Sequence, residues 1–485
     1  MAKNILIFSD GTGQAGGVRP DQRLSNIYKL YRATRPWTDT PIHPDDQVAF
    51  YDAGLGTDED GGSLPFRAWR FLRKLASSMT GTGLSRNITD CYAAILRHYE
   101  PGDRIYLFGF SRGAYTARCV ANVLALCGVP STDGQGRPLP RAGARLRAIA
   151  AEAVDSVYDH ASRTAKDDAL AQREEKARRF RARYQSEDAN GEWAAPYFIG
   201  VFDTVAALGL STALRYLLWG LMVALVVIAY LITRYWFDAP QAANTSAGIT
   251  AGVLLTLVTA YVISRLRLIK DYPVKGQFRL SYSSGLAGSY DLKLDTRVGF
   301  ARHALAIDET RRDFARVGWG RKGEGVAKSE NEPEWFKQIW FAGCHSDIGG
   351  SYAEDESRLS DVTLKWMVDE VQATPHPIVI DEAKLQLAPS ALGPQHCEIH
   401  RLRDSYPKWW FLPRWSWPAK PRKEAAGATL HRSVAERIAA MQVVHPDGVK
   451  PYRPATLALD PTLSHFYAHH EDRALGTDKK HERAL

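Results

Sequence analysis

The sequence predicts an α/β fold in which a parallel sheet is flanked by helices. Short apolar runs at 4–8, 48–51, 105–108, 197–202 and 338–342 alternate with longer stretches whose apolar residues recur at helical spacing. Strands that alternate with helices are typical of parallel sheets. Most of these runs lead directly into a polar loop, so we expect polar side chains to gather at the carboxyl edge of the sheet.

Composition and charge limit the class of protein. The chain has 485 residues, of which 45% are hydrophobic and 24% charged, so it can form one elaborated domain with a sizeable core. Its net charge of +8 suits nucleic acid or anionic lipid, but no nucleic-acid-binding motif is present. The five cysteines lack the spacing of a metal site or a disulfide framework, and we expect neither a metal nor a cofactor. The first ten residues lack the features of a secretory signal peptide, which predicts a cytoplasmic main body.

The segment after the third apolar run carries the strongest motif. The run 105–108 leads into Gly109, Ser111 and Gly113, and apolar residues then recur at helical spacing. The G-x-S-x-G pattern between a strand and a helix is typical of a nucleophile elbow, where glycines allow the sharp turn that exposes the serine hydroxyl. Ser111 is therefore the predicted nucleophile.

A nucleophile of this kind needs backbone amides to stabilise the oxyanion that its attack creates. The amide of Arg112, directly after the serine, is the expected first donor. The glycine-rich loop that ends the first strand offers Gly11 or Thr12 as the second donor. A plain connecting turn is the alternative interpretation of that loop.

Three helical stretches and one more strand complete the first half of the chain. The segment 26–31 predicts a short helix, and 88–99 predicts a helix that packs on the sheet. The segment 141–184, rich in alanine, arginine and glutamate, predicts inserted helices that either cover the site or form a charged surface. The strand 197–202 delivers Asp203 at its end.

Two long uncharged runs, at 216–233 and 239–264, then interrupt the pattern. About 20 apolar residues cross a hydrocarbon core of about 30 Å, so each run is long enough to span a bilayer. The sequence predicts a transmembrane helical hairpin at 215–268, inserted between the first part of the α/β domain at 1–214 and the second part at 269–485. A pair of buried helices or an apolar lid is the alternative.

Positive charge flanks the predicted hairpin on one side of the membrane. Arg215 precedes it and Arg265, Arg267 and Lys270 follow it. Arg234 lies close enough to the end of the first run to snorkel, and the connecting loop otherwise carries only Asp238. By the positive-inside rule both ends of the hairpin, and with them the α/β domain, lie in the cytoplasm. The bilayer is therefore the expected partner.

The chain after the hairpin returns to the sheet. The segment 302–317 predicts a helix, 338–342 predicts a strand that runs into His345, and 364–371 predicts a further packed helix.

A loop at 407–423 combines tryptophans with positive charge, including Lys420, Arg422 and Lys423. Such a loop either rests on anionic lipid or packs its tryptophans beneath a solvated basic rim.

Three polar residues that each follow a predicted strand form a candidate catalytic set. A serine hydroxyl becomes nucleophilic when a histidine removes its proton, and a carboxylate orients that histidine. Ser111, Asp203 and His345 occur in the order Ser, Asp, His expected of α/β-hydrolases, and would meet at the carboxyl edge of the sheet.

Two further carboxylates are expected in supporting roles. Asp347 lies two residues after His345 and is predicted to orient that loop through backbone amides, with ion binding as the alternative. Asp10 competes with Asp203 as the triad acid, but it precedes the serine, contrary to the expected order.

Four separated phrases carry a family resemblance: FSDGT (8–12), GFSRGAYTAR (109–118), GVFDTV (200–205) and HSDIGG (345–350), with a fifth, LHRSV, at 430–434. In these phrases the chain resembles the α/β-hydrolases of an uncharacterised-domain family that includes the type VI secretion phospholipase effectors. The resemblance implies Ser111 as nucleophile, Asp203 as acid and His345 as base, with a phospholipid ester as substrate.

Motifs and hairpin together predict a membrane-anchored serine hydrolase of the bacterial inner membrane, which cleaves lipid esters through an acyl-enzyme. Its catalytic domain is expected in the cytoplasm, and the sequence does not identify a protein partner. The alternatives are an exported antibacterial type VI effector and a catalytically silent membrane scaffold. A membrane hairpin between the triad acid and the triad histidine favours anchoring over export.

Overall fold

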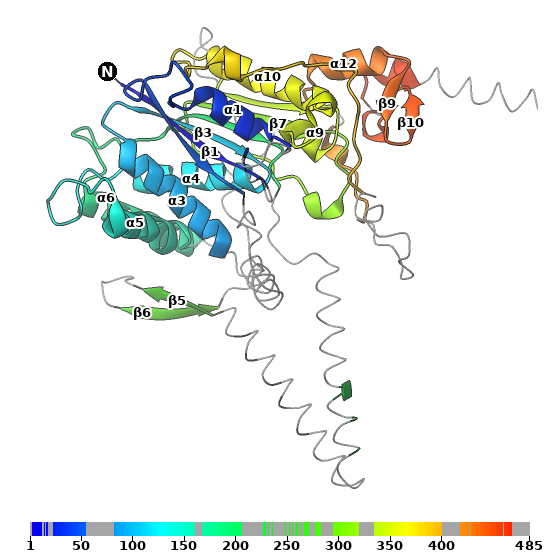
Figure 1. The fold of residues 1–485 in the computed structure, drawn as a ribbon. Helices are drawn as coiled ribbons and strands as arrows, with labels where there is room; N and C mark the ends of the chain where they lie inside the picture. The colour runs from blue at the N-terminus through cyan, green and yellow to red at the C-terminus, as the bar shows by residue number, and fades with distance from the viewer. Residues whose placement is uncertain are drawn as a thin grey trace, which may run out of the picture.

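The computed structural model describes residues 2–11, 14, 16–17, 23–54, 82–160, 167–205, 266–270, 277–282, 294–319, 334–399, 418–425, 427–458 and 460–467, with nine single positions between 227 and 262. These residues form a six-stranded sheet with helices on both faces (Figure 1). The strand order is β2-β1-β3-β4-β7-β8, and all neighbouring strands are parallel. The predicted parallel α/β sheet is thus confirmed. Its strands are β1 (Asn4–Ser9), β2 (Gln47–Asp52), β3 (Arg104–Phe110), β4 (Pro196–Phe202), β7 (Phe300–Ala306) and β8 (Phe336–Phe341).

The two faces of the sheet pack against different helices because successive side chains of a strand point to opposite faces. Ile5 and Ile7 of β1 lie in one core, and Leu6 and Phe8 lie in the other. The first core holds α3 (Thr82–His98), α4 (Arg112–Cys127), α5 (Gly143–Ala151), the π-helix η1 (Glu152–Tyr158) and α6 (Asp167–Tyr184). The second holds α1 (Asn26–Thr34) and α10 (Arg358–Gln372).

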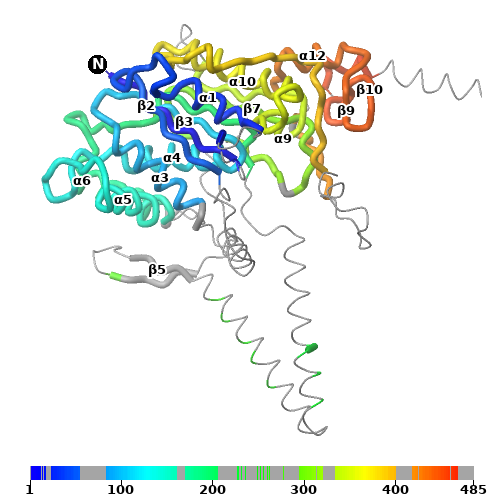
Figure 2. The backbone as a smooth tube through the Cα atoms, in the orientation of Figure 1, coloured from blue at the N-terminus to red at the C-terminus, as the bar shows by residue number. Residues whose placement is uncertain are grey.

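The C-terminal elements gather beside the edge strand β8. Leu430 forms a parallel bridge with Trp340 of β8, which extends the sheet locally. Figure 2 shows α12 (Arg432–Ala439) next to the hairpin of β9 (Val443–His445) and β10 (Gly448–Lys450) at this end of the molecule. The remaining elements are the ribbon of β5 (Leu266–Lys270) with β6 (Phe278–Tyr282), the short helix α9 (His345–Gly349), and 3-10 turns at Arg312–Phe314, Glu354–Glu356, Glu382–Lys384, Lys423–Ala425 and Ala455–Leu457.

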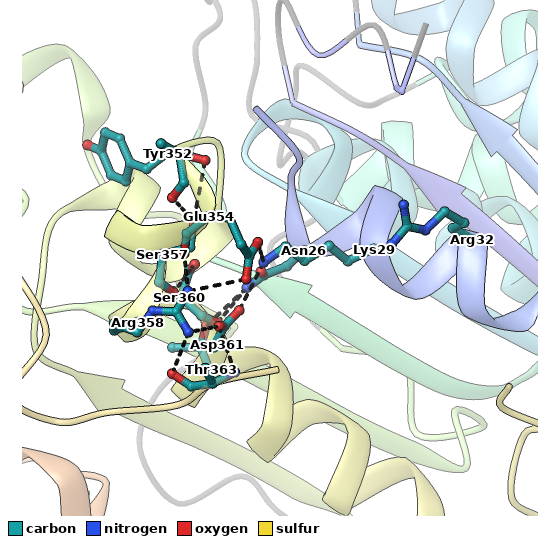
Figure 3. Close-up of polar contacts among 12 residues, drawn as sticks. Asn26, Lys29, Arg32, Tyr352, Glu354, Ser357, Arg358, Ser360, Asp361 and Thr363 are labelled. Carbon is teal, nitrogen blue, oxygen red and sulfur yellow. Dashed lines mark hydrogen bonds and ion pairs between the residues drawn. The ribbon is translucent and has the colours of Figure 1, made fainter. Parts of the chain in front are cut away.

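A buried polar network joins α1 to α10 (Figure 3). Lys29 Nζ lies 3.0 Å from Asp361 Oδ1 and 3.1 Å from Glu354. The Asn26 side-chain amide donates to the carbonyls of Ile348 and Ser360 at 2.9 and 3.0 Å. The Asn26 bond to Ile348 ties α9, which begins with His345, to α1.

The predicted helix at 302–317 is wrong, because residues Phe300–Ala306 form the buried strand β7. Two polar side chains obscure the strand pattern in the sequence, and each has a partner inside the fold. Arg302 pairs with Glu370 at 2.5 Å, and His303 Nδ1 lies 3.3 Å from Gln338 Oε1. Such pairings make buried polar residues tolerable, but they depend on tertiary contacts that periodicity does not reveal.

Within the described residues, no helix is both long and apolar enough to cross a membrane. The two uncharged runs at 216–233 and 239–264 fall almost entirely outside these residues. The hairpin, and the domain boundaries drawn from it, therefore remain predictions. Residues 407–417 of the tryptophan-rich loop also lie outside the described chain.

Candidate active site

The turn between β3 and α4 places Ser111 in an unusual backbone conformation. Its φ is 58° and its ψ −120°, a region that a residue with a side chain adopts only when the surrounding structure imposes it. The two flanking glycines permit this turn. A Cβ on Gly109 would lie 2.4 Å from the Gly113 carbonyl, and one on Gly113 would lie 2.0 Å from the Ser9 carbonyl. The Ser111 amide donates to the Phe202 carbonyl at 3.1 Å, which ties the turn to the end of β4.

The next residue of that strand end is Asp203, which contacts His345. Asp203 Oδ2 and His345 Nδ1 lie 2.6 Å apart, and both side chains are buried. This contact requires the proton on Nδ1, which leaves Nε2 as the basic nitrogen of the imidazole. The His345 ring packs on Phe110, the residue before Ser111, with ring centroids 4.7 Å apart. His345 Nε2 is buried and has no hydrogen-bond partner among the described residues.

A cation also contacts Asp203. Arg422 Nη1 lies 2.5 Å from Oδ1 and Nη2 lies 3.0 Å from Oδ2, while the Ala306 amide donates to Oδ1 at 3.1 Å. Burial alone would raise the pKa of Asp203, but the charge of Arg422 and the hydrogen bond with His345 outweigh it and hold the pKa well below its usual range.

Sequence reasoning missed Arg422 and grouped it with a lipid-facing or solvated basic loop. The structure instead buries it at 5% exposure. No local pattern marks this arginine, because its partner lies 219 positions away in the chain.

The predicted oxyanion donors lie close to the elbow. Arg112 is the first residue of α4, where backbone amides have no partner inside the helix. Gly11 is adjacent to the elbow, since a Cβ built on it would lie 3.3 Å from the Ser111 Cβ. Its amide already donates to Asp10 Oδ1 at 2.7 Å, so a donor role for Gly11 requires that this bond be given up. Thr12 lies outside the described residues.

Asp10 and Asp347 both hold loops. Asp10 accepts hydrogen bonds from Ser25, from Tyr51 at 2.8 Å and from the Gly11 amide, while its burial raises its pKa to about 6. Asp347 accepts from the Cys344 amide at 3.0 Å. Its other contacts are with the amide and ring of His396, at 3.1 and 2.7 Å. In the part of the chain that the structure describes, no group of acidic, histidine and cysteine side chains is arranged to hold a metal ion.

Comparisons with known proteins point to one family. Residues 3–241 and 261–370 match the model of the catalytic domain of Tle1-like type VI secretion phospholipase effectors. An uncharacterized protein of Saccharomyces cerevisiae is 33% identical over 132 residues, which is 27% of this chain and 18% of the yeast protein.

Two solved structures are also similar. One is an uncharacterized protein from Pseudomonas aeruginosa, with 17% identity, 80% of this chain and 49% of that chain covered, and a TM-score of 0.36. The other is the Tle1 effector bound to the VgrG spike, with 19% identity, 74% and 53% coverage, and a TM-score of 0.29. The chain thus spans about half the length of each solved chain that it matches.

Proposed function

The chain belongs to the family of Tle1-like type VI secretion phospholipase effectors, and we propose that it is a serine hydrolase that cleaves phospholipid esters. One observation carries the proposal. The buried contact of 2.6 Å between Asp203 and His345 lies directly against the elbow that presents Ser111. A nucleophile, a base and an acid at one sheet edge are the parts that acyl transfer requires.

In the proposed reaction His345 Nε2 accepts the Ser111 proton while Oγ bonds to the ester carbonyl carbon. The Asp203 carboxylate stabilises the resulting imidazolium, and the Arg112 amide binds the oxyanion together with a second amide of the 9–13 loop. Collapse of the tetrahedral intermediate breaks the ester bond, and the leaving alcohol takes the proton from His345. Water then attacks the acyl-enzyme by the same route and releases the fatty acid.

Replacement of Ser111 by Ala tests this proposal. We expect S111A to lose phospholipid ester hydrolysis by at least about 10³-fold, because the nucleophile is removed. A fluorophosphonate probe should label the wild type and not S111A. S360A is the matched control, since Ser360 is also buried and its hydroxyl donates to the carbonyl of Ser357, the residue before α10. Hydrolysis retained by S111A would contradict the proposal, and an unlabelled wild type would favour the silent scaffold.

We further propose that residues 215–268 hold the enzyme at the bacterial inner membrane, with the catalytic domain in the cytoplasm. The uncharged runs support this, as do the described apolar positions within them. Val227, Ile228, Leu231 and Leu255 are helical and between 48% and 68% exposed, which suits helices whose surface faces lipid. The full-length protein should remain with membranes after alkaline carbonate extraction.

An exported effector is the second candidate, and family membership favours it. The Tle1 effector of the solved complex is bound to a VgrG spike, and the corresponding proposal gives this chain a spike protein as partner. Release into the soluble fraction by carbonate, together with co-purification of a VgrG protein, would support export. Retention in the membrane pellet would support the anchored enzyme.

A further inference from the structure

We propose that Arg422 is the positioning residue of the predicted triad, because it holds the Asp203 carboxylate in its orientation toward His345 and offsets its charge. The inference rests on the proposed function and extends it to the C-terminal part of the chain. The family match ends at residue 370, whereas Arg422 lies 52 positions later.

The contacts of Arg422 restrain both oxygens of the carboxylate. One guanidinium nitrogen lies 2.5 Å from Oδ1 and another lies 3.0 Å from Oδ2. This two-point geometry is specific to arginine, since a lysine ammonium is a single point of charge. Oδ2 also contacts His345, so rotation of the carboxylate away from the imidazole would break bonds at both oxygens.

A short antiparallel pairing brings Arg422 to this position. The Arg312 amide donates to the Pro418 carbonyl at 2.9 Å, and the Lys420 amide donates to the Thr310 carbonyl at 2.6 Å. Arg422 then donates to the carbonyls of Ala306 and Phe314 at 3.2 and 2.9 Å. The Phe314 ring packs edge-on against the His345 ring at 5.2 Å, so Arg422 supports a wall of the imidazole as well as its acid.

The other charged groups near His345 are already engaged. Glu309 accepts from the His345 amide at 3.2 Å and is paired with Arg311 at 2.8 Å. Asp347, in the same short helix as His345, accepts a hydrogen bond from the Cys344 amide and contacts the His396 ring. Among the described residues, Arg422 is thus the cation that directly offsets the charge of Asp203. Without it, the charge of Asp203 would act on the imidazole without this offset, so we expect the Arg422 variants to alter the pH dependence of the reaction as well as its rate.

The test compares R422M, R422K and R437M in the full-length enzyme. In R422M we expect kcat to fall by about 10²-fold to 10³-fold, and the acidic limb of the kcat/KM profile to move to higher pH by about one unit. In R422K, the acidic limb of the profile should lie closer to its wild-type pH, while kcat recovers only in part. Arg437 is the matched control, since it is fully buried and donates to the Ala391 and Gly393 carbonyls at 2.7 and 2.8 Å, away from the triad. R437M should lower the thermal midpoint and leave the limb unmoved.

Two results would overturn the inference. The first is a pH profile of R422M whose acidic limb stays at the wild-type pH, combined with a loss of activity that is no larger than its loss of stability explains. The second result applies if R422M does not fold. In that case a folded R422K with the wild-type kcat and the wild-type pH profile would overturn the inference. Failure of the proposed function looks different, because S111A would then retain hydrolysis whatever the Arg422 variants do.

Discussion

Buried or half-buried carboxylates occur in two regions of the same sheet edge, and their partners differ. After β4, Asp203 contacts a guanidinium and an imidazole, and its pKa is held well below the usual range. At the ends of β1 and β2, Asp10 and Asp52 accept hydrogen bonds from hydroxyls and amides. Burial raises the pKa of Asp10 to about 6 and that of Asp52 to about 7.

The difference shows that burial alone does not decide the charge of these acids. Desolvation disfavours the carboxylate in both regions, and only a nearby cation reverses its effect. Asp203, which contacts His345, therefore keeps its negative charge, and that charge can stabilise an imidazolium. Asp10 and Asp52, in the other region, can be protonated near neutral pH. They shape the start of the first loop, where the Ser9 and Asp10 carbonyls pack on Gly113.

The largest effect is expected from the replacement of Asp203 by Asn (D203N), which removes the charged acid of this contrast. The amide removes the negative charge and disfavours the Nδ1-protonated tautomer, so we expect kcat to fall by about 10⁴-fold. Arg422 would be left as a buried cation without its carboxylate, which should lower the free energy of unfolding by about 3–5 kcal/mol. Steady-state hydrolysis and urea unfolding at pH 7 measure both effects. A folded D203N with activity within tenfold of the wild type would remove Asp203 from the mechanism.

A second buried ion pair separates the effect of pairing from that of catalysis. Lys29 contacts Asp361 at 3.0 Å in the network of Figure 3, and the Asp361 side chain is fully buried. K29M should lower the free energy of unfolding by about 3 kcal/mol, because Asp361 then keeps only the more distant Arg358, whose Nη1 lies 3.6 Å from Oδ2. The kcat of the folded enzyme should stay unchanged. The control K365M removes the exposed pair with Asp369 and should cost about 0–1 kcal/mol. A large fall in kcat for K29M would show that any buried pair near this edge affects the chemistry.

The same contrast explains how far the sequence could predict the site. Ser111, Asp203 and His345 each follow an apolar run that becomes a strand, so local pattern placed them at one edge. Arg422 and β7 were not predictable in this way. The role of Arg422 depends on a pairing between 418–420 and 310–312, and β7 contains polar residues whose partners come from other elements.

On the side without a cation, D10N should change how stability depends on pH. The folded-state pKa of about 6 exceeds the unfolded value of about 3.9, so the folded state binds this proton more tightly. The contribution of Asp10 is therefore full below about pH 4 and is lost as pH rises to about 6, a change of about 3 kcal/mol. D10N cannot ionise, and its free energy of unfolding relative to the wild type should rise by that amount between pH 4 and 7. Parallel urea-unfolding curves for the two proteins across this range would contradict a raised pKa.

The smallest expected effect comes from Y51F, which removes a single donor to Asp10. The Tyr51 hydroxyl donates to Oδ2 at 2.8 Å, and a hydrogen bond to the charged form favours that form. We expect Y51F to raise the pKa of Asp10 further and to lower the free energy of unfolding by about 2 kcal/mol at pH 7.5, but by only about 1 kcal/mol at pH 4.5, where Asp10 is protonated.

The matched control for Y51F is Y92F, whose hydroxyl donates to the neutral Gly128 carbonyl at 2.7 Å. Its cost should be the same at pH 4.5 and 7.5, because neither partner titrates in that range. The Tyr51 ring packs on Tyr28 and Tyr31, contacts that phenylalanine keeps, so cavity effects should not obscure the comparison. An equal loss for Y51F at both pH values would mean that Asp10 does not change charge between them, and the contrast with Asp203 would then have to rest on geometry alone.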